Sequence, residues 1–148
     1  DLLLCPRRRG PWSLDDVHRT LLGANAAGRV ERWPIGLPVI CGSNQPELGL
    51  ANGDLGVVIG AGSERRLLFH VVDPDGRLEV RRLHPARLRR LEPAVALTIH
   101  RAQGSEADRV IVLWPDPLED GPAAEHQRRL LYTAITRARA SLDLVTLI

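Results

Sequence analysis

The chain has 148 residues, with 20 basic and 18 acidic side chains, and its formal net charge of +2 does not by itself indicate a nucleic-acid-binding protein. This length suits one domain, or one domain with a small insertion, and 44% hydrophobic residues suffice for a core. The sequence contains arginine but no lysine. A standard phosphate-binding loop is therefore excluded, because that loop needs a lysine at the β- and γ-phosphates. The sequence has no signal peptide or membrane-spanning run and no metal-binding Cys/His spacing, so Cys5 and Cys41 are expected to be reduced thiols of a cytoplasmic protein.

The N-terminal residues predict a buried strand followed by a helix. The apolar run 2–5 is short and ends at Pro6, as expected of a strand. Ser13 is in position to cap a helix, and Asp16 follows three residues later in a pattern close to a capping box. The apolar face of this helix is expected to contain Leu14, Val17 and Leu21.

The middle of the chain has a different character. Turn sequences at 52–54 and 73–76 contain Gly with Asn or Pro, and Asp75-Gly76 between two apolar runs is a strong hairpin signal. This spacing predicts a small antiparallel barrel within residues 35–91. Its four strands are expected at 37–41, 55–59, 67–72 and 78–83.

The last third predicts a return to a parallel sheet. Short apolar runs at 95–99 and 110–113 suit strands that are buried on both faces, and the polar loop between them would lie at the end of the first strand, where such sheets bind ligands. After a turn-rich loop at 116–122, residues 123–139 predict a helix whose buried stripe is Leu130, Leu131, Ala134, Ile135 and Ala138. A final strand is expected at 142–148.

Two stretches of this region resemble known sequence motifs. Residues 98–106 read T-I-H-R-A-Q-G-S-E, and residues 132–139 read Y-T-A-I-T-R-A-R. Together, in this order and at this separation, they resemble motifs V and VI of superfamily 1 helicases. The resemblance is greatest to the RecD-like branch, which includes the alpha subunit of exodeoxyribonuclease V. It covers nearly the whole chain but only the C-terminal part of the family, because motifs I, II and III are lacking.

The resemblance implies a fold and a domain division. The fold class is α/β: a RecA-like second motor domain (2A), formed by residues 1–34 and 92–148, is interrupted by an SH3-like antiparallel β-barrel (2B) at 35–91. Because the sequence begins directly at Asp1 in a strand-like run, without Met, we expect a fragment of a longer polypeptide.

The resemblance also implies site residues. Phosphoryl transfer needs charge stabilisation on the γ-phosphate, and Arg137 corresponds to the arginine finger that supplies it. Arg139 is two positions away, roughly 200° around a helix, and is therefore not expected to serve the same phosphate. Nucleotide contacts are implied for Gln103, Gly104 and Glu106, and DNA-backbone contacts for Thr98 and His100.

The implied function is that of the C-terminal part of an ATP-dependent DNA helicase that translocates on single-stranded DNA in recombinational repair. ATP and Mg²⁺ would be held mainly by an N-terminal motor domain of the same polypeptide, and this chain would be inactive alone. Further partners would be single-stranded DNA and RecB- and RecC-like subunits. No membrane association is expected. The alternatives are a subunit-docking or nucleic-acid-binding module centred on the barrel, and part of a conjugative relaxase-helicase. Weaker candidate contacts are Arg8, Arg9, Asn44, Asn52 and the arginines from Arg65 onward in the barrel.

Overall fold

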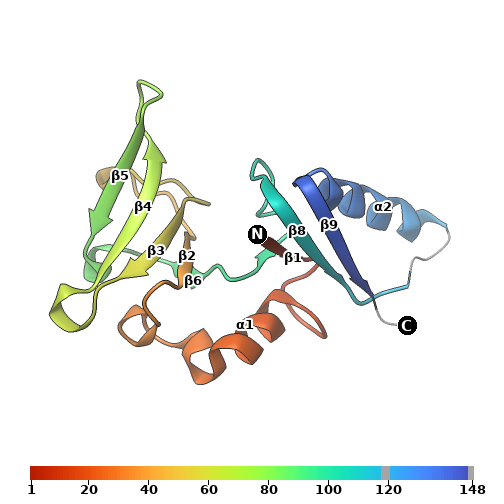
Figure 1. The fold of residues 1–148 in the computed structure, drawn as a ribbon, viewed down its shortest axis with the longest axis horizontal. Helices are drawn as coiled ribbons and strands as arrows, with labels where there is room; N and C mark the ends of the chain where they lie inside the picture. The colour runs from red at the N-terminus through yellow and green to blue at the C-terminus, as the bar shows by residue number, and fades with distance from the viewer. Residues whose placement is uncertain (118–120, 147–148) are drawn as a thin grey trace. The chain divides into compact units, whose positions relative to one another are not determined.

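The computed structural model describes residues 1–117 and 121–146 (Figure 1). The chain divides into two compact units: Asp1–Leu21 with Ala96–Ile148, and Leu22–Val95. We call them the first and the second unit. The second unit extends beyond the expected insertion, 35–91, at both ends. Part of the expected loop at 116–122 (118–120) and the end of the expected final strand (147–148) lie outside the described residues.

The first unit contains a four-stranded sheet in the order β7-β1-β8-β9. Every strand pair is parallel, which confirms the predicted parallel sheet. The central strand β1 pairs on both sides, with Leu4 opposite Leu97 on one side and Val112 on the other, and all three side chains are buried. The elements are β1 (Leu2–Cys5), α1 (Leu14–Leu22), β7 (Leu97–Thr98), β8 (Ala107–Trp114), α2 (Pro122–Ile135) and β9 (Ala138–Thr146).

Helix α1 begins as its capping sequence predicts. The Asp16 amide donates to Ser13 Oγ at 3.3 Å, and Asp16 Oδ2 accepts from the Trp12 amide at 3.2 Å. Leu14 is buried, but Leu21 is 58% exposed, so its assignment to the buried face is wrong. Instead His18 is buried, and its Nε2 accepts from the Ala96 amide at 3.3 Å, which ties the helix to the segment leading into β7.

Helix α2 ends earlier than expected. It stops at Ile135, and β9 begins at Ala138, so Arg137 lies in the connecting turn rather than in the helix. The Ala107 amide donates to the Arg137 carbonyl at 3.0 Å, and Ala138 is registered opposite Ala107 in the ladder between β8 and β9. Pairing with the sheet therefore overrides the local helix propensity of this sequence. The predicted burial of Ile135 is also wrong, because this side chain is 42% exposed, whereas Ala134 is buried.

The second unit contains a five-stranded sheet in the order β5-β4-β3-β2-β6, and every strand pair is antiparallel. All four predicted strands are present, at β2 (Pro38–Cys41), β3 (Leu55–Ile59), β4 (Arg66–Val72) and β5 (Leu78–Leu83), together with β6 (Leu91–Pro93). In the part of the chain that the structure describes, the edge strands β5 and β6 do not pair, so a closed barrel is not confirmed. Short 3₁₀ helices lie at Gly23–Ala27, Val30–Arg32, Pro46–Leu48, Gly62–Glu64 and Pro85–Arg87.

The segment that precedes β2 packs onto the second unit. Trp33 is buried in that unit's core, and its Nε1 donates to the Asn25 carbonyl at 2.9 Å. The Arg65 guanidinium donates to the Val30 carbonyl at 3.1 Å and to the Trp33 carbonyl. These contacts explain why the unit begins at Leu22.

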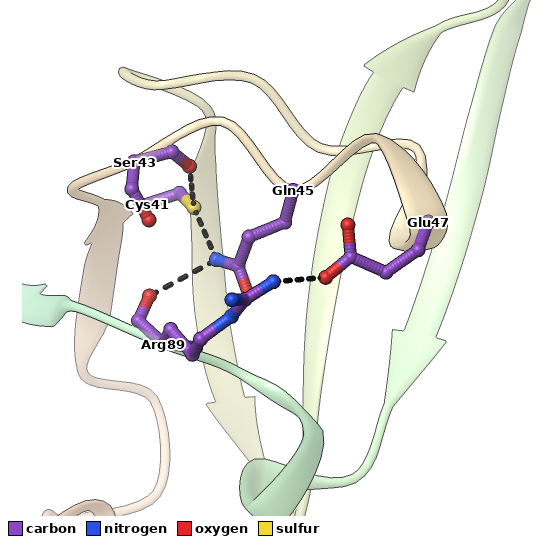
Figure 2. A network of polar contacts seen from close by, with 5 residues as sticks. All are labelled: Cys41, Ser43, Gln45, Glu47 and Arg89. Carbon is purple, nitrogen blue, oxygen red and sulfur yellow. Dashed lines mark hydrogen bonds and ion pairs between the residues drawn. The ribbon is translucent and has the colours of Figure 1, made fainter.

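A buried amide side chain joins two distant segments of the second unit (Figure 2). Gln45 is fully buried; its Nε2 donates to the Arg89 carbonyl at 3.0 Å, and its Oε1 accepts from the Arg89 amide at 2.9 Å. Nε2 also donates to Cys41 Sγ at 3.1 Å, and the thiol donates to the Ser43 carbonyl at 3.1 Å. At the surface, Arg89 forms an ion pair with Glu47. The network fixes the loop after β2 against the segment that leads into β6.

Candidate functional site

The loop after β7 is held by main-chain hydrogen bonds. The Ile99 amide donates to the Cys5 carbonyl at 3.0 Å, which anchors the start of the loop to the end of β1. The Ala102 amide then donates to the Thr98 carbonyl at 3.1 Å, and the Ser105 amide donates to the Ala102 carbonyl at 3.0 Å. The loop is therefore compact and fixed at the carboxyl end of a parallel strand, where ligands bind in sheets of this class.

Gly104 has a conformational role in this loop. Its φ is +87°, a region that L side chains rarely adopt, and a Cβ atom at this position would meet nothing within 4 Å. The positive φ, and not a close contact within the protein, therefore explains the glycine. The open space beside it leaves the backbone accessible.

Arg137 lies against the same loop. Its Nε donates to the Thr133 carbonyl at 3.2 Å, and its Nη1 donates to the Ser105 carbonyl at 3.5 Å. A third contact joins Nη2 to Thr136 Oγ1 at 3.2 Å. The guanidinium is half-buried and is oriented by the last turn of α2 and by the loop together.

Glu106 lies one residue after the carbonyl that Arg137 contacts. Its Oε2 accepts from Arg139 Nε at 3.1 Å, and both side chains are largely exposed. Arg137 and Arg139 thus have different partners, but both contact the end of the loop, close to the start of β9. The structure brings Arg137 and Glu106 to one place, and the partner of Arg139 was not found from the sequence.

The other predicted residues precede Gly104: Thr98 ends β7, and His100 and Gln103 lie in the loop. Thr98 Oγ1 accepts from the Arg101 amide at 3.4 Å, so this hydroxyl has a local structural partner. His100 and Gln103 are exposed and line a hollow of about 160 Å³ against α2. The α2 side of this hollow was missed in the sequence, although its residues lie on one face of the helix: His126, the adjacent pair Arg129 and Leu130, and Thr133.

The weaker candidates have structural partners. Arg8 and Arg9 both lie within 4 Å of Asp15 in the first turn of α1, at 3.8 and 3.9 Å. Asn44 Oδ1 accepts from the Asn52 amide at 2.8 Å, which closes the loop before β3.

Residues 1–117 and 121–146 contain no group of three or more His, Cys, Asp or Glu side chains that could hold a metal ion. Within the same ranges, no helix is both long enough and apolar enough to cross a membrane.

Comparison with known proteins identifies the family. Residues 93–145 match the profile of the UvrD-like helicase C-terminal domain, a range that includes the loop, α2 and most of β9. The RecBCD enzyme subunit RecD of Mycolicibacterium smegmatis is 36% identical over 147 residues, which are 97% of this chain and 24% of that protein. The ATP-dependent RecD2 DNA helicase of Deinococcus radiodurans is 36% identical over 144 residues, 93% of this chain and 19% of that protein.

The chain corresponds to the C-terminal region of RecD-like helicases. It spans about a quarter of the length of the RecD relatives that it matches. A Pif1 helicase from Bacteroides, in complex with ADP-AlF3 and single-stranded DNA, has the same fold at a TM-score of 0.60 and 18% identity, covering 99% of this chain and 40% of that one. A second Pif1 structure, also bound to single-stranded DNA, has a TM-score of 0.56 at 17% identity. The mixed α/β fold, with separate parallel and antiparallel sheets, is thus similar to that of these Pif1 helicases.

Proposed function

We propose that this chain is the second motor domain of an ATP-dependent DNA helicase and that Arg137 is its arginine finger. The proposal rests above all on one observation: Arg137 and Glu106 meet at a single junction, where Arg137 contacts the carbonyl of Ser105 and Glu106 follows directly. A guanidinium held against Ser105 and a carboxylate on the next residue, paired with Arg139, would suit the phosphates and the ribose of one nucleotide, respectively.

The donor set at this junction fits a triphosphate. A guanidinium has five N–H donors, and Arg137 is oriented by carbonyl groups that carry no full charge, so its own charge remains available to an anion. An arginine finger acts by stabilising the charge that develops on the γ-phosphate. Gly104 and Gln103, in the same loop, would lie beside the nucleotide. The lobe that holds the phosphate-binding loop and Mg²⁺ would be the N-terminal motor domain.

The DNA strand would follow the other part of the loop, at Thr98 and His100. A hydroxyl and an imidazole both donate to phosphate oxygens, and phosphate contacts position a strand without reading its sequence. Closure of the two motor lobes on ATP would then move these contacts along the strand. The relatives named as RecBCD enzyme subunits support RecB- and RecC-like partners. We also propose a role in recombinational repair.

Replacement of Arg137 by Ala in the full-length protein tests the assignment. We expect ATP hydrolysis to fall by about a thousandfold or more, because the finger acts mainly in the transition state. Nucleotide affinity, measured with a fluorescent ATP analogue, should change little. Arg137→Lys should also be inactive, because an ammonium group lacks the planar fork of donors.

Arg128→Ala is the matched control, because Arg128 is an exposed arginine on α2, nine positions before Arg137. It should hydrolyse ATP at the normal rate. Normal turnover by the Arg137→Ala protein would exclude the finger, and an equal loss in both variants would indicate a general effect of charge.

A docking module is the second candidate function, and the β4–β5 hairpin favours it. Val72 and Leu78 face each other across the two strands and are 67% and 69% exposed, and Val80 is 55% exposed on the same face of the hairpin. Exposed apolar groups of this kind are typical of protein contacts. Capture of RecB- or RecC-like subunits by the full-length protein, with and without residues 35–91, separates the docking module from the motor domain.

The conjugal transfer protein TraA of Rhizobium radiobacter is 34% identical over 113 residues, which supports the relaxase-helicase alternative.

A further inference from the structure

The hollow between the loop and α2 is lined by more hydrogen-bond donors than the two helicase-like motifs contribute. It has a volume of about 160 Å³ and belongs entirely to the first unit. Two imidazoles, a guanidinium, an amide and a hydroxyl surround it, and only one lining side chain is apolar. The lining residues are His100, Gln103, His126, Arg129, Leu130 and Thr133.

The contribution of α2 comes from one face of the helix. His126, Arg129 and Thr133 are separated by three and four positions, the spacing at which helical side chains are neighbours. Thr133 Oγ1 donates to the Arg129 carbonyl at 2.9 Å, and Arg129 Nε donates to Glu125 Oε1 at 2.9 Å. His126 and Arg129 lie outside both motif-like stretches, 98–106 and 132–139. The resemblance therefore assigns them no role.

The chemistry of this lining selects an anion. The ion pair with Glu125 engages Nε of Arg129, and a guanidinium has four further N–H donors on its terminal nitrogens. The imidazoles and the amide of Gln103 add donors that a tetrahedral phosphate accepts from several directions. We propose that the hollow binds one backbone phosphate of the single-stranded DNA, with Arg129 and His126 as strand contacts supplied by α2.

The position of the hollow favours the DNA strand over the nucleotide. His100, which the proposed function places on the strand, lines the hollow. Arg137 and Glu106, which the proposed function places on the nucleotide, are not among its described lining residues, whereas Gln103 lines the hollow and would lie between the nucleotide and the strand. The inference thus rests on the proposed function and extends the strand path from the loop onto α2.

Binding of a fluorescein-labelled dT oligonucleotide to the full-length protein, measured by fluorescence anisotropy over a series of KCl concentrations, tests the inference. Arg129→Gln should weaken binding about tenfold at low salt, because a charge-assisted contact to phosphate is lost. The slope of log affinity against log salt should become shallower by about 0.7, the value for one phosphate contact on a single strand. His126→Ala should weaken binding in the same direction.

Two further variants make the test specific. Arg128→Gln removes the same charge from the adjacent position of α2, which does not line the described hollow, and it should leave the salt slope unchanged. Glu125→Gln removes the carboxylate that is paired with Arg129, so binding should become tighter. An equal effect of Arg128→Gln and Arg129→Gln would overturn the inference, because only general surface charge would then matter.

The failure of this inference is distinguishable from the failure of the proposed function. If the unaltered protein bound no dT oligonucleotide, both would fall. If it bound the oligonucleotide and Arg129→Gln bound equally well, only the strand contact on α2 would fall. If Arg129→Gln weakened binding of a fluorescent ATP analogue and left the oligonucleotide unaffected, the hollow would belong to the nucleotide, and the assignment to the strand would be wrong.

Discussion

The two units use their polar side chains in different ways. In the second unit, Gln45 is fully buried, and its amide bonds to the main chain of Arg89 and to a thiol, so the group holds the unit together. In the first unit, His100, Arg129 and Arg139 are at the surface, around one loop that main-chain hydrogen bonds fix in place. Polar groups that are already satisfied inside a unit contribute stability, whereas those left accessible on a rigid loop are available to a ligand. This contrast supports the proposed ligand contacts in the first unit.

Loss of the buried amide should show that the second unit depends on it. Gln45→Met keeps a side chain of similar length but leaves the amide and carbonyl of Arg89 without their partner. We expect the free energy of unfolding to fall by about 3 kcal/mol, the cost of leaving buried polar groups unpaired. Urea unfolding measures the loss, and hydrogen exchange locates it within residues 22–95.

The control for this prediction is Asn44→Ala. Asn44 is exposed, and its single contact with the Asn52 amide closes a surface loop, so its loss should cost less than about 1 kcal/mol. If Gln45→Met were as mild as Asn44→Ala, the network in Figure 2 would not be the element that holds the second unit.

The first unit has its own buried titratable group, and this group should make the unit sensitive to alkali. Burial raises the pKa of the Cys5 thiol to about 11 from its usual 9.0. Between these two values the unfolded chain loses the proton and the folded chain keeps it. Stability is therefore intact below about pH 9 and falls as the pH rises towards 11.

The size of this effect follows from the difference between the two pKa values, which are about 2 units apart. The free energy of unfolding should decrease by up to about 2 kcal/mol over this range. Cys5→Ala should be less stable at neutral pH, because it leaves a small cavity in the core, but its stability should vary less between pH 9 and 11. Parallel curves for the two proteins would show that the thiol does not cause the alkaline loss.

The sequence predicted features that depend on neighbouring residues better than features that depend on distant contacts. Hydrophobic patterning and turn residues are local, so the strands at 55–59 and 78–83 and the capped start of α1 were found at or near their true bounds. The end of α2 was not, because Ala107 and Ala138 are distant in the sequence and their pairing decides where the helix stops. The partners of Gln45 and Arg139 are likewise distant, and a sequence pattern shows residue types but not which of them meet.

The loop side of the candidate site could be predicted because its residues are close together in the sequence. Gln103 and Glu106 lie within one short stretch, so the resemblance located them together. The α2 side of the hollow lay outside any motif and became visible only when the helix face was placed against the loop. Arg129 could therefore be assigned to the hollow only from the tertiary structure, although its spacing from Thr133 was already present in the sequence.

The smallest expected effect concerns the surface ion pair beside the buried amide. Glu47 lies at the start of a short 3₁₀ helix, and a hydrogen bond from the main chain there, together with Arg89, holds the pKa of its carboxyl below the usual value. A lowered pKa means that the folded state favours the charged carboxylate. The contribution to stability is therefore present above the usual pKa and is lost as the pH falls through the folded value.

Glu47→Gln should slightly lower the urea midpoint at neutral pH and make it less dependent on pH between about 5 and 3. Because the pair is exposed, added salt should shrink the difference from the unaltered protein. The loss caused by Gln45→Met should be the same in high salt, because it arises from buried hydrogen bonds rather than from surface charge. If salt and acid altered both variants equally, the distinction between the buried amide and the exposed ion pair would fail, and with it the argument that the second unit is held from within.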